Sequence, residues 1–212
     1  MLKINELFLG IQGESTYAGC LCIILRLTGC HLQCAYCDSQ FAFFEGEERT
    51  VEQVFDEIQL MGCKLICITG GEPLLQKDLP TLVNLLINNG YTVLLETSGS
   101  LSVEKIPREV IKIMDLKTPG SGMEANNLYR NIGYLGEHDE VKFVLSSRED
   151  YVWAKRKIHE YDLEKKCKVL LSPVLGRLDP SLLAQWIIED KVDARLQIQI
   201  HKIIWPGRES GI

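Results

Sequence analysis

Cys30, Cys34 and Cys37 lie within eight residues of one another in the sequence. This C-x3-C-x2-C spacing allows one loop to bring three thiolates onto a single small metal–sulfur body. A cubane iron–sulfur cluster has four irons and is usually held by four cysteine thiolates. No fourth cysteine stands nearby, so a cluster on this loop would keep one iron open for another ligand.

Two other interpretations of these cysteines compete with the cluster. A structural zinc ion takes four protein ligands, usually as two pairs from separate parts of the chain, and only His31 could complete such a set locally. The thiols could also be plain buried side chains or form a disulfide. The spacing favours the cluster over both alternatives.

Further polar motifs accompany the cysteine loop along the chain. They read GIQGES at 10–15, RLTGC at 26–30, CDS at 37–39, TGGEP at 69–73, ETSG at 96–99 and QIHK at 199–202. The cysteine loop resembles the signature of the radical S-adenosylmethionine (SAM) superfamily, in which three cysteines hold a 4Fe–4S cluster and SAM chelates the open iron. Taken with the other motifs, nearly the whole chain resembles the 7-carboxy-7-deazaguanine synthase family.

The resemblance implies which residues meet the cofactors. The three cysteines would bind the cluster, and the ring of Tyr36 would lie near the adenine of SAM. The implied SAM contacts are Tyr36, Cys37, Asp38, Gly71, Ser98, Asp115, Leu116 and Lys117. From the residues alone, the double glycine at 70–71 and the ETSG run could equally be ordinary turns.

Arg26 is the one charged residue in the apolar run at 21–27. A buried guanidinium needs an anionic partner, either another side chain in a structural ion pair or the carboxylate of a ligand. The resemblance makes Arg26 the clamp for the carboxylate of 6-carboxy-5,6,7,8-tetrahydropterin. The substrate contacts that it implies are Ile11, Gln12, Gly13, Arg26, Thr69 and His201. Taken alone, a single histidine such as His201 is more often structural.

Ser39 stands where the resembled family usually has a threonine after its aspartate. In that family the hydroxyl helps to bind Mg2+, a hard ion that prefers oxygen ligands and keeps several of its waters. A serine hydroxyl offers the same oxygen, so the resemblance implies a Mg2+ site at Ser39.

Length and composition are typical of a soluble globular protein. The 212 residues fit one domain spanning 1–212, and 46% of them are hydrophobic. The net charge of −6 argues against a nucleic-acid partner. The apolar runs are far shorter than a membrane span and the N-terminus lacks the apolar core of a signal peptide, so we expect a cytoplasmic protein with no membrane partner.

Five cysteines lie outside the loop, namely Cys20, Cys22, Cys63, Cys67 and Cys167. A second cluster would need three or four cysteines grouped closely, and Cys63 with Cys67 make only a pair. We expect these five to be small packed side chains in a reducing compartment.

Short apolar runs alternate with amphipathic segments along the chain. We expect strands at 4–9, 21–27, 65–68, 91–95, 110–116, 140–145, 168–171 and 196–200. We expect helices at 51–58 with Thr50 as N-cap, at 79–89 ended by Gly90, at 149–161 and at 180–190. The first two strands have no helix between them.

This alternation indicates parallel strands joined by helical crossovers. A closed barrel of eight such units needs about 250 residues, more than this chain has. We therefore predict an α/β fold, an incomplete (open) TIM-like barrel of about six parallel strands with few crossover helices, as the resemblance also implies. The polar motifs follow strands that end near 27, 68, 95 and 116, at the carboxyl ends where such folds bind ligands.

The resemblance implies a radical SAM lyase of 7-deazapurine (queuosine-type) biosynthesis. In the implied reaction a 5′-deoxyadenosyl radical takes hydrogen from C6 of the pterin, the ring contracts, and ammonia leaves to give 7-carboxy-7-deazaguanine. A flavodoxin- or ferredoxin-type electron donor is also implied, as is a homodimer whose partner could protect the open edges of the sheet.

Two alternative functions share the cysteine loop. One is an activating enzyme that generates a glycyl radical on another protein. The motifs around Gln12 and Arg26 argue against this function. The other is a non-catalytic protein that holds structural zinc through the three cysteines and His31.

Overall fold

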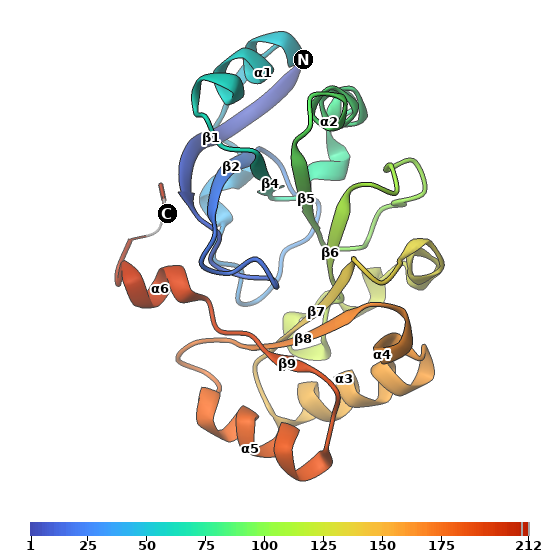
Figure 1. Cartoon of the computed structure of the whole chain (residues 1–212). Helices are drawn as coiled ribbons and strands as arrows, with labels where there is room; N and C mark the ends of the chain where they lie inside the picture. Colours follow the sequence, from blue (N-terminus) through green and yellow to red (C-terminus); the bar gives the residue numbers. More distant parts are fainter. Residues whose placement is uncertain (209, 212) are drawn as a thin grey trace.

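The fold is built on one curved sheet of nine strands, in the order β3-β1-β2-β4-β5-β6-β7-β8-β9 (Figure 1). The computed structural model describes residues 1–208 and 210–211. The strands are β1 (Leu2–Ile11), β2 (Leu21–Leu27), β3 (Glu47–Arg49), β4 (Leu65–Gly70), β5 (Thr92–Thr97), β6 (Ile111–Asp115), β7 (Glu140–Leu145), β8 (Lys168–Pro173) and β9 (Arg195–Leu196).

From β2 to β9 every neighbouring pair of strands is parallel, whereas β1 is antiparallel to both β2 and β3. The two ends of the sheet, β3 and β9, do not pair with each other. This arrangement confirms the predicted open barrel, and β9, with two residues, adds little to its parallel strands.

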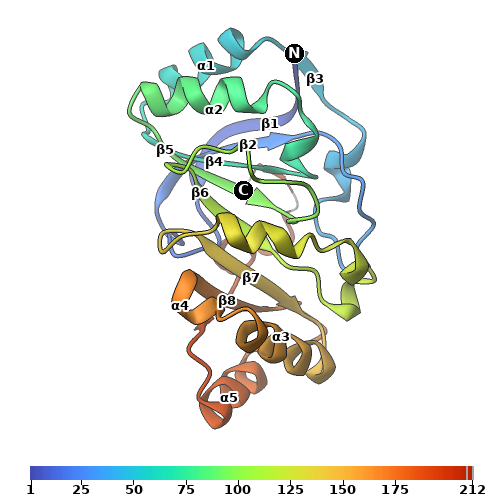
Figure 2. The ribbon, with the colours of Figure 1, turned by 90° about the vertical axis from the view of Figure 1, so that its right-hand side faces the viewer.

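Helices cover the outer face of the sheet in two groups. They are α1 (Val51–Leu60), α2 (Leu79–Asn88), α3 (Arg148–Glu160), α4 (Leu163–Lys166) and α5 (Pro180–Asp190). The short α6 (Ile200–Ile204) lies instead beside the connection between β1 and β2. Figure 2 shows α1 and α2 over one part of the sheet and α3, α4 and α5 over the other. Among the described residues no helix joins β5 to β6, and only short 3₁₀ turns join β6 to β7, so crossover helices are few, as predicted. None of the described helices has both the length and the apolar character of a bilayer span.

Alternation along each strand separates two apolar layers. Ile23, Leu25 and Leu27 of β2 face outward and pack in the core that includes α1 and α2. The residues between them face the inside of the barrel, where a smaller apolar cluster forms. That inner cluster contains Cys22, Ile24, Cys67, Leu94, Ile111 and Ile113.

Helix α1 begins where its sequence predicts. The Thr50 hydroxyl accepts the N–H of Gln53 at 3.2 Å, and the Gln53 side chain accepts the N–H of Thr50 at 2.9 Å. This capping box satisfies donors that the first turn leaves open. Helix α2 also ends as predicted. Gly90, just after it, has a φ of +75°, the left-handed conformation that ends many helices.

The predicted strand at 196–200 is wrong beyond Leu196. Strand β9 ends at Leu196, and α6 begins at Ile200. The alternating polar and apolar residues are typical of a strand, but the N–H of Ile200 donates to the carbonyl of Gly13 at 3.0 Å instead of to the sheet. The chain therefore leaves the sheet to pack on the connection between β1 and β2, and His201 lies on a helix.

Replacing Thr50 by alanine should lower the free energy of unfolding by about 1 kcal/mol, because α1 loses its N-cap acceptor. Urea unfolding at equilibrium measures this change. Thr50→Ser keeps the hydroxyl and should unfold like the original protein. Equal unfolding of the alanine and serine variants would contradict the role of the cap.

Candidate active site

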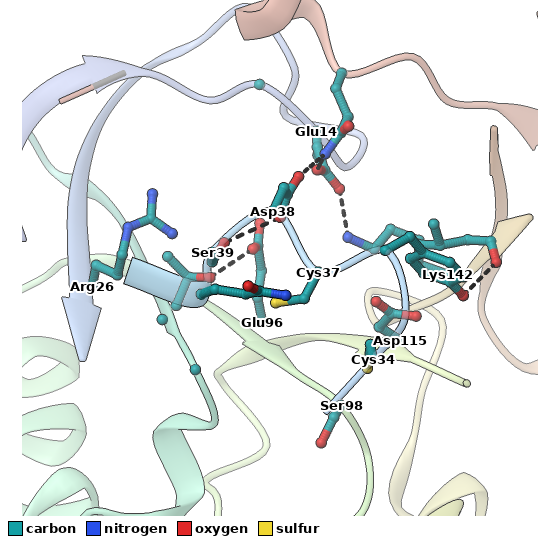
Figure 3. Close-up of a pocket in the computed structure, with 18 of the residues that line it drawn as sticks. Glu14, Arg26, Cys34, Cys37, Asp38, Ser39, Glu96, Ser98, Asp115 and Lys142 are labelled. Carbon is teal, nitrogen blue, oxygen red and sulfur yellow. Dashed lines mark hydrogen bonds and ion pairs between the residues drawn. The ribbon is translucent and has the colours of Figure 1, made fainter. Parts of the chain in front are cut away.

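Five consecutive parallel strands each place one polar side chain inside the barrel. These are Arg26 on β2, Thr69 on β4, Glu96 on β5, Asp115 on β6 and Lys142 on β7, and all five line one cavity of about 790 Å³ (Figure 3). Arg26 pairs in register with Thr69, and Asp115 pairs with Lys142. The inner face is thus apolar along part of its length and strongly polar near the carboxyl ends of the strands, as predicted for a ligand site.

Cys30, Cys34 and Cys37 line the same cavity and are partly buried. Burial raises the pKa of all three thiols, and the nearby ammonium of Lys117 partly opposes that rise. The N–H of Ala35 donates to the Ser121 carbonyl at 3.0 Å, which fixes the loop against the segment after β6. Three free thiols on one wall of the cavity could bind a cluster, and each thiol would lose its proton on binding.

His31 does not complete a zinc site with these cysteines. Its Nε2 lies 2.8 Å from the Ser100 hydroxyl, and the residue does not line the cavity. Among the described residues, no three His, Cys, Asp or Glu side chains group tightly enough to hold a single ion. In an iron–sulfur cluster each thiolate binds a different iron, so the thiolates need not converge on one point. The donor set therefore fits a cluster with three protein ligands.

Tyr36 is fixed at the cavity wall by its hydroxyl. That hydroxyl donates to the carbonyl of Val144 at 2.9 Å and lies 3.0 Å from the hydroxyl of Thr118. Burial, and next the charge of Asp115, raise the pKa of Tyr36 well above its usual value, so the ring stays neutral. A neutral aromatic surface next to the cysteine loop suits the predicted contact with adenine.

Glu72 joins two of the sequence motifs. It is fully buried, and its carboxylate accepts the hydroxyl of Thr97 and the N–H of Ser98, each at 2.8 Å, as well as the hydroxyl of Ser98. Gly71 packs so closely that an added Cβ would lie 2.1 Å from the carbonyl oxygen of Gly29. The glycine motif and the ETSG motif are therefore one rigid unit beside the cysteine loop.

Arg26 makes a structural ion pair and still faces the cavity. Its Nε–H donates to Glu6 at 2.7 Å, and its guanidinium lies 5.4 Å from the ring centre of Phe41. Among the described residues, none accepts a hydrogen bond from its two terminal nitrogens. The ion pair orients the guanidinium, and its terminal edge remains available for a carboxylate.

A chain of charged and amide groups crosses the cavity (Figure 3). Lys142 donates to Glu14 at 2.5 Å, and the Gln199 amide donates to Glu14 at 2.5 Å and to Asp38 at 3.1 Å. Lys202 donates to the same oxygen of Asp38 at 2.6 Å. The chain links β7, the β1–β2 connection, the cysteine loop and α6.

Both carboxylates in this chain stay ionised. Burial alone would raise the pKa of Glu14, but the ammonium of Lys142 and its hydrogen bond lower it overall. Burial would likewise raise the pKa of Asp38, and the charge and hydrogen bond of Lys202 hold it well below its usual range. The Ser39 hydroxyl donates to the other Asp38 oxygen at 3.1 Å, so Ser39 sits beside a fixed negative charge.

Two buried polar atoms in the cavity wall have no hydrogen-bond partner among the described residues. They are Nε2 of Gln12 and Oδ1 of Asp115. Buried polar groups in proteins are nearly always satisfied, so a free donor and a free acceptor in one cavity point to a bound ligand.

Nearly all of the predicted site residues come together here. Those that line the cavity are Ile11, Gln12, Gly13, Arg26, Cys30, Cys34, Tyr36, Cys37, Asp38, Ser39, Thr69, Gly71, Ser98, Asp115, Lys117 and His201. The Leu116 side chain instead packs fully buried in the core under α3, which leaves only its backbone for the predicted contact with SAM. The individual roles of these residues stay predictions.

Other lining residues were not assigned a role from the sequence. They include Glu14, Glu96, Lys142, Gln199 and Lys202. Lys142 interrupts an apolar strand just as Arg26 does, so the same signal could have found it. Glu14, Gln199 and Lys202 stand inside recognised motifs but carry no signal of their own.

Comparison with known proteins agrees with this geometry. The sequence profile described as "Radical SAM superfamily" matches residues 24–177. The chain is 40% identical over 226 aligned residues to the 7-carboxy-7-deazaguanine synthase of Koribacter versatilis, with 100% of each chain covered. It is 38% identical to the 7-carboxy-7-deazaguanine synthase of Chlorobaculum tepidum, with 100% of this chain and 97% of the relative covered. The chain belongs to the 7-carboxy-7-deazaguanine synthase family.

Structural comparison supports the fold of this synthase family member. The crystal structure of QueE from Escherichia coli matches it with a TM-score of 0.76 at 24% identity, covering 93% of each chain. The cysteine loop lies within the residues that the radical SAM profile matches. The synthase therefore uses a 4Fe–4S cluster and SAM, together with the Mg2+ of its family.

Replacing Lys142 by methionine should destabilise the synthase by about 3–5 kcal/mol at pH 7, because Glu14 becomes a buried charge without its paired cation. In the original protein the lowered pKa of Glu14 gives stability that is present above its unfolded value of 4.5 and is lost as the pH falls through the folded pKa. In the variant, burial raises that pKa, so the variant gains stability as Glu14 takes up a proton below pH 7.

Urea unfolding at pH 7 and near pH 4.5 measures this effect. The difference between the variant and the original protein should shrink at the lower pH. Lys142→Arg keeps the charge and is the matched control. A destabilisation that is the same at both pH values would show that Lys142 acts through packing alone.

Proposed function

We propose that this synthase converts 6-carboxy-5,6,7,8-tetrahydropterin to 7-carboxy-7-deazaguanine with release of ammonia, in 7-deazapurine biosynthesis. The observation that carries the proposal is that the three-cysteine loop and the guanidinium edge of Arg26, which is free of hydrogen bonds among the described residues, line one cavity. The relatives named 7-carboxy-7-deazaguanine synthase, aligned over the full chain, support this substrate.

The chain's own residues divide the cavity between cofactor and substrate. Cys30, Cys34 and Cys37 would hold the cluster, which together with SAM would supply the radical chemistry needed to remove a hydrogen atom from the pterin. The backbone at Gly71 and the ring of Tyr36 would hold SAM on the side of the cysteine loop. The Glu72 carboxylate keeps this side rigid through its bonds to Thr97 and Ser98.

The pterin would lie against the polar residues of the opposite wall. The two terminal nitrogens of Arg26 would bind the pterin carboxylate in a bidentate way. The amide hydrogens of Gln12, which have no partner among the described residues, would donate to the edge of the pterin ring. Thr69, whose hydroxyl donates to Glu96 at 2.9 Å, and His201 would complete the contacts. Burial lowers the pKa of His201, so the imidazole would be neutral at pH 7.

Ser39 would supply the hydroxyl oxygen for Mg2+. Its position beside the ionised Asp38 suits a hard cation. We further propose that the whole chain, 1–212, acts as one cytoplasmic radical SAM domain, which forms a homodimer and takes its electron from a flavodoxin- or ferredoxin-type protein. The sheet edges at β3 and β9, which have no partner strand in the described chain, support a contact between copies.

An anaerobic assay of the reconstituted, reduced protein tests the reaction. With SAM and the pterin, mass spectrometry should detect 7-carboxy-7-deazaguanine, and Cys34→Ala should abolish both the product and SAM cleavage. SAM cleavage without this product would discard the proposed substrate and favour the activation of another protein. Bound zinc without either reaction would overturn the radical chemistry.

The Mg2+ role is tested by two substitutions at Ser39. Ser39→Ala should raise the Mg2+ concentration needed for half-maximal activity by about tenfold, because one oxygen ligand is lost. Ser39→Thr restores the family's usual hydroxyl and should require no more Mg2+ than the original enzyme. Titration of activity with Mg2+ after treatment with a chelator measures both, and an unchanged requirement in the alanine variant would exclude Ser39 as a ligand.

A further inference from the structure

The connection between β1 and β2 is anchored on a distant strand. Glu140, the first residue of β7, is fully buried and faces the same side of the sheet as Lys142. Its two carboxylate oxygens accept the N–H of Thr16 at 3.1 and 3.2 Å, and one of them also accepts the Thr16 hydroxyl at 2.5 Å. These bonds join residues 124 positions apart in the sequence.

The neighbouring residue shows why the connection needs an anchor. Ser15 is fully buried and has a φ of +65°, a left-handed conformation that costs energy for a residue with a Cβ. Its hydroxyl accepts the N–H of Tyr17 at 3.0 Å, which holds the turn locally. Such strain persists only where surrounding contacts fix the backbone, and Thr16 is the adjacent fixed point.

The strained turn also sets the direction of the Gln12 amide. The Gln12 oxygen accepts the N–H of Glu14 at 3.1 Å. That bond leaves the amide nitrogen as the buried donor with no partner among the described residues. The Gln12 backbone is itself held by hydrogen bonds to Gly19 and Cys20, so movement at 14–16 would act on the amide through the N–H of Glu14.

We propose that Glu140 is a positioning residue of the synthase, which anchors Thr16 and thereby aims the Gln12 amide at the pterin. Glu140 and Thr16 do not line the cavity, so both act through the turn. The identity of the ligand as the pterin rests on the proposed function, whereas the anchoring of the turn by Glu140 does not.

Two matched variants of Thr16 test the proposal. Thr16→Val removes the hydroxyl at nearly constant shape and should raise the KM for the pterin by about tenfold, because a charge-assisted hydrogen bond is lost. The KM for SAM and the rate of SAM cleavage without pterin should stay unchanged. Thr16→Ser keeps the hydroxyl and should match the original enzyme. Glu140→Gln, which keeps its shape with one acceptor oxygen, should act in the same direction as Thr16→Val.

Amide hydrogen exchange at 12–16 gives a readout that needs no ligand. Exchange there should become faster in Thr16→Val and Glu140→Gln but not in Thr16→Ser. A valine variant that melts at a lower temperature with unchanged pterin KM would overturn the proposal in favour of a structural contact. Equal losses for pterin and SAM would also overturn it.

The same experiment separates this proposal from the proposed function. If the original protein neither binds nor converts the pterin, the proposed function fails. Unchanged exchange at 12–16 in both Thr16→Val and Glu140→Gln would then overturn the anchor as well, and faster exchange would support it.

Discussion

The ion pair between Lys142 and Glu14 is the contact on which the geometry of the cavity depends. Its two groups come from β7 and from the connection after β1, which four strands separate in the sheet. A buried charge is tolerated only when an opposite charge and hydrogen bonds replace its lost water. Each group therefore fixes the other, and together they connect the β1 side of the open sheet to β7 across the cavity. Gln199 extends this tie to α6 and Asp38, so the side that strand pairing leaves open is closed by side chains.

Local sequence pattern was sufficient for the parts of the fold that burial alone determines. Strands with apolar residues on both faces, such as 21–27 and 140–145, were predicted at their observed positions. Arg26 was recognised because a charge in such a run must have a partner. Lys142 meets the same criterion in its own strand, so the rule that found Arg26 would have found Lys142 as well. Glu96 stands one residue before the end of β5, just beyond the predicted strand, and that rule does not reach it.

Contacts between distant segments could not be predicted in this way. The residues at 196–200 alternate like a strand, but the N–H of Ile200 donates to the carbonyl of Gly13, far away in the sequence, and α6 begins there. Lys202 meets Asp38 across 164 positions. The partners of Ile200 and Lys202 depend on how the barrel folds in three dimensions. The periodicity of the sequence does not encode that arrangement. The anchor of Thr16 by Glu140 belongs to the same class, because a glutamate at the start of a strand is ordinarily exposed.

The antiparallel β1 explains how a short chain builds two different walls. The cysteine loop, Gly71 and Ser98 follow the carboxyl ends of parallel strands, as in a complete barrel. Gln12 and Gly13 instead follow β1, which runs the opposite way and reaches β2 without a helix. One hairpin connection thus replaces a strand–helix unit and brings backbone and amide groups into the cavity. These residues belong to a separate connection, which Glu140 and Lys142 hold through Thr16 and Glu14, so this wall of the cavity is positioned independently of the cysteine loop.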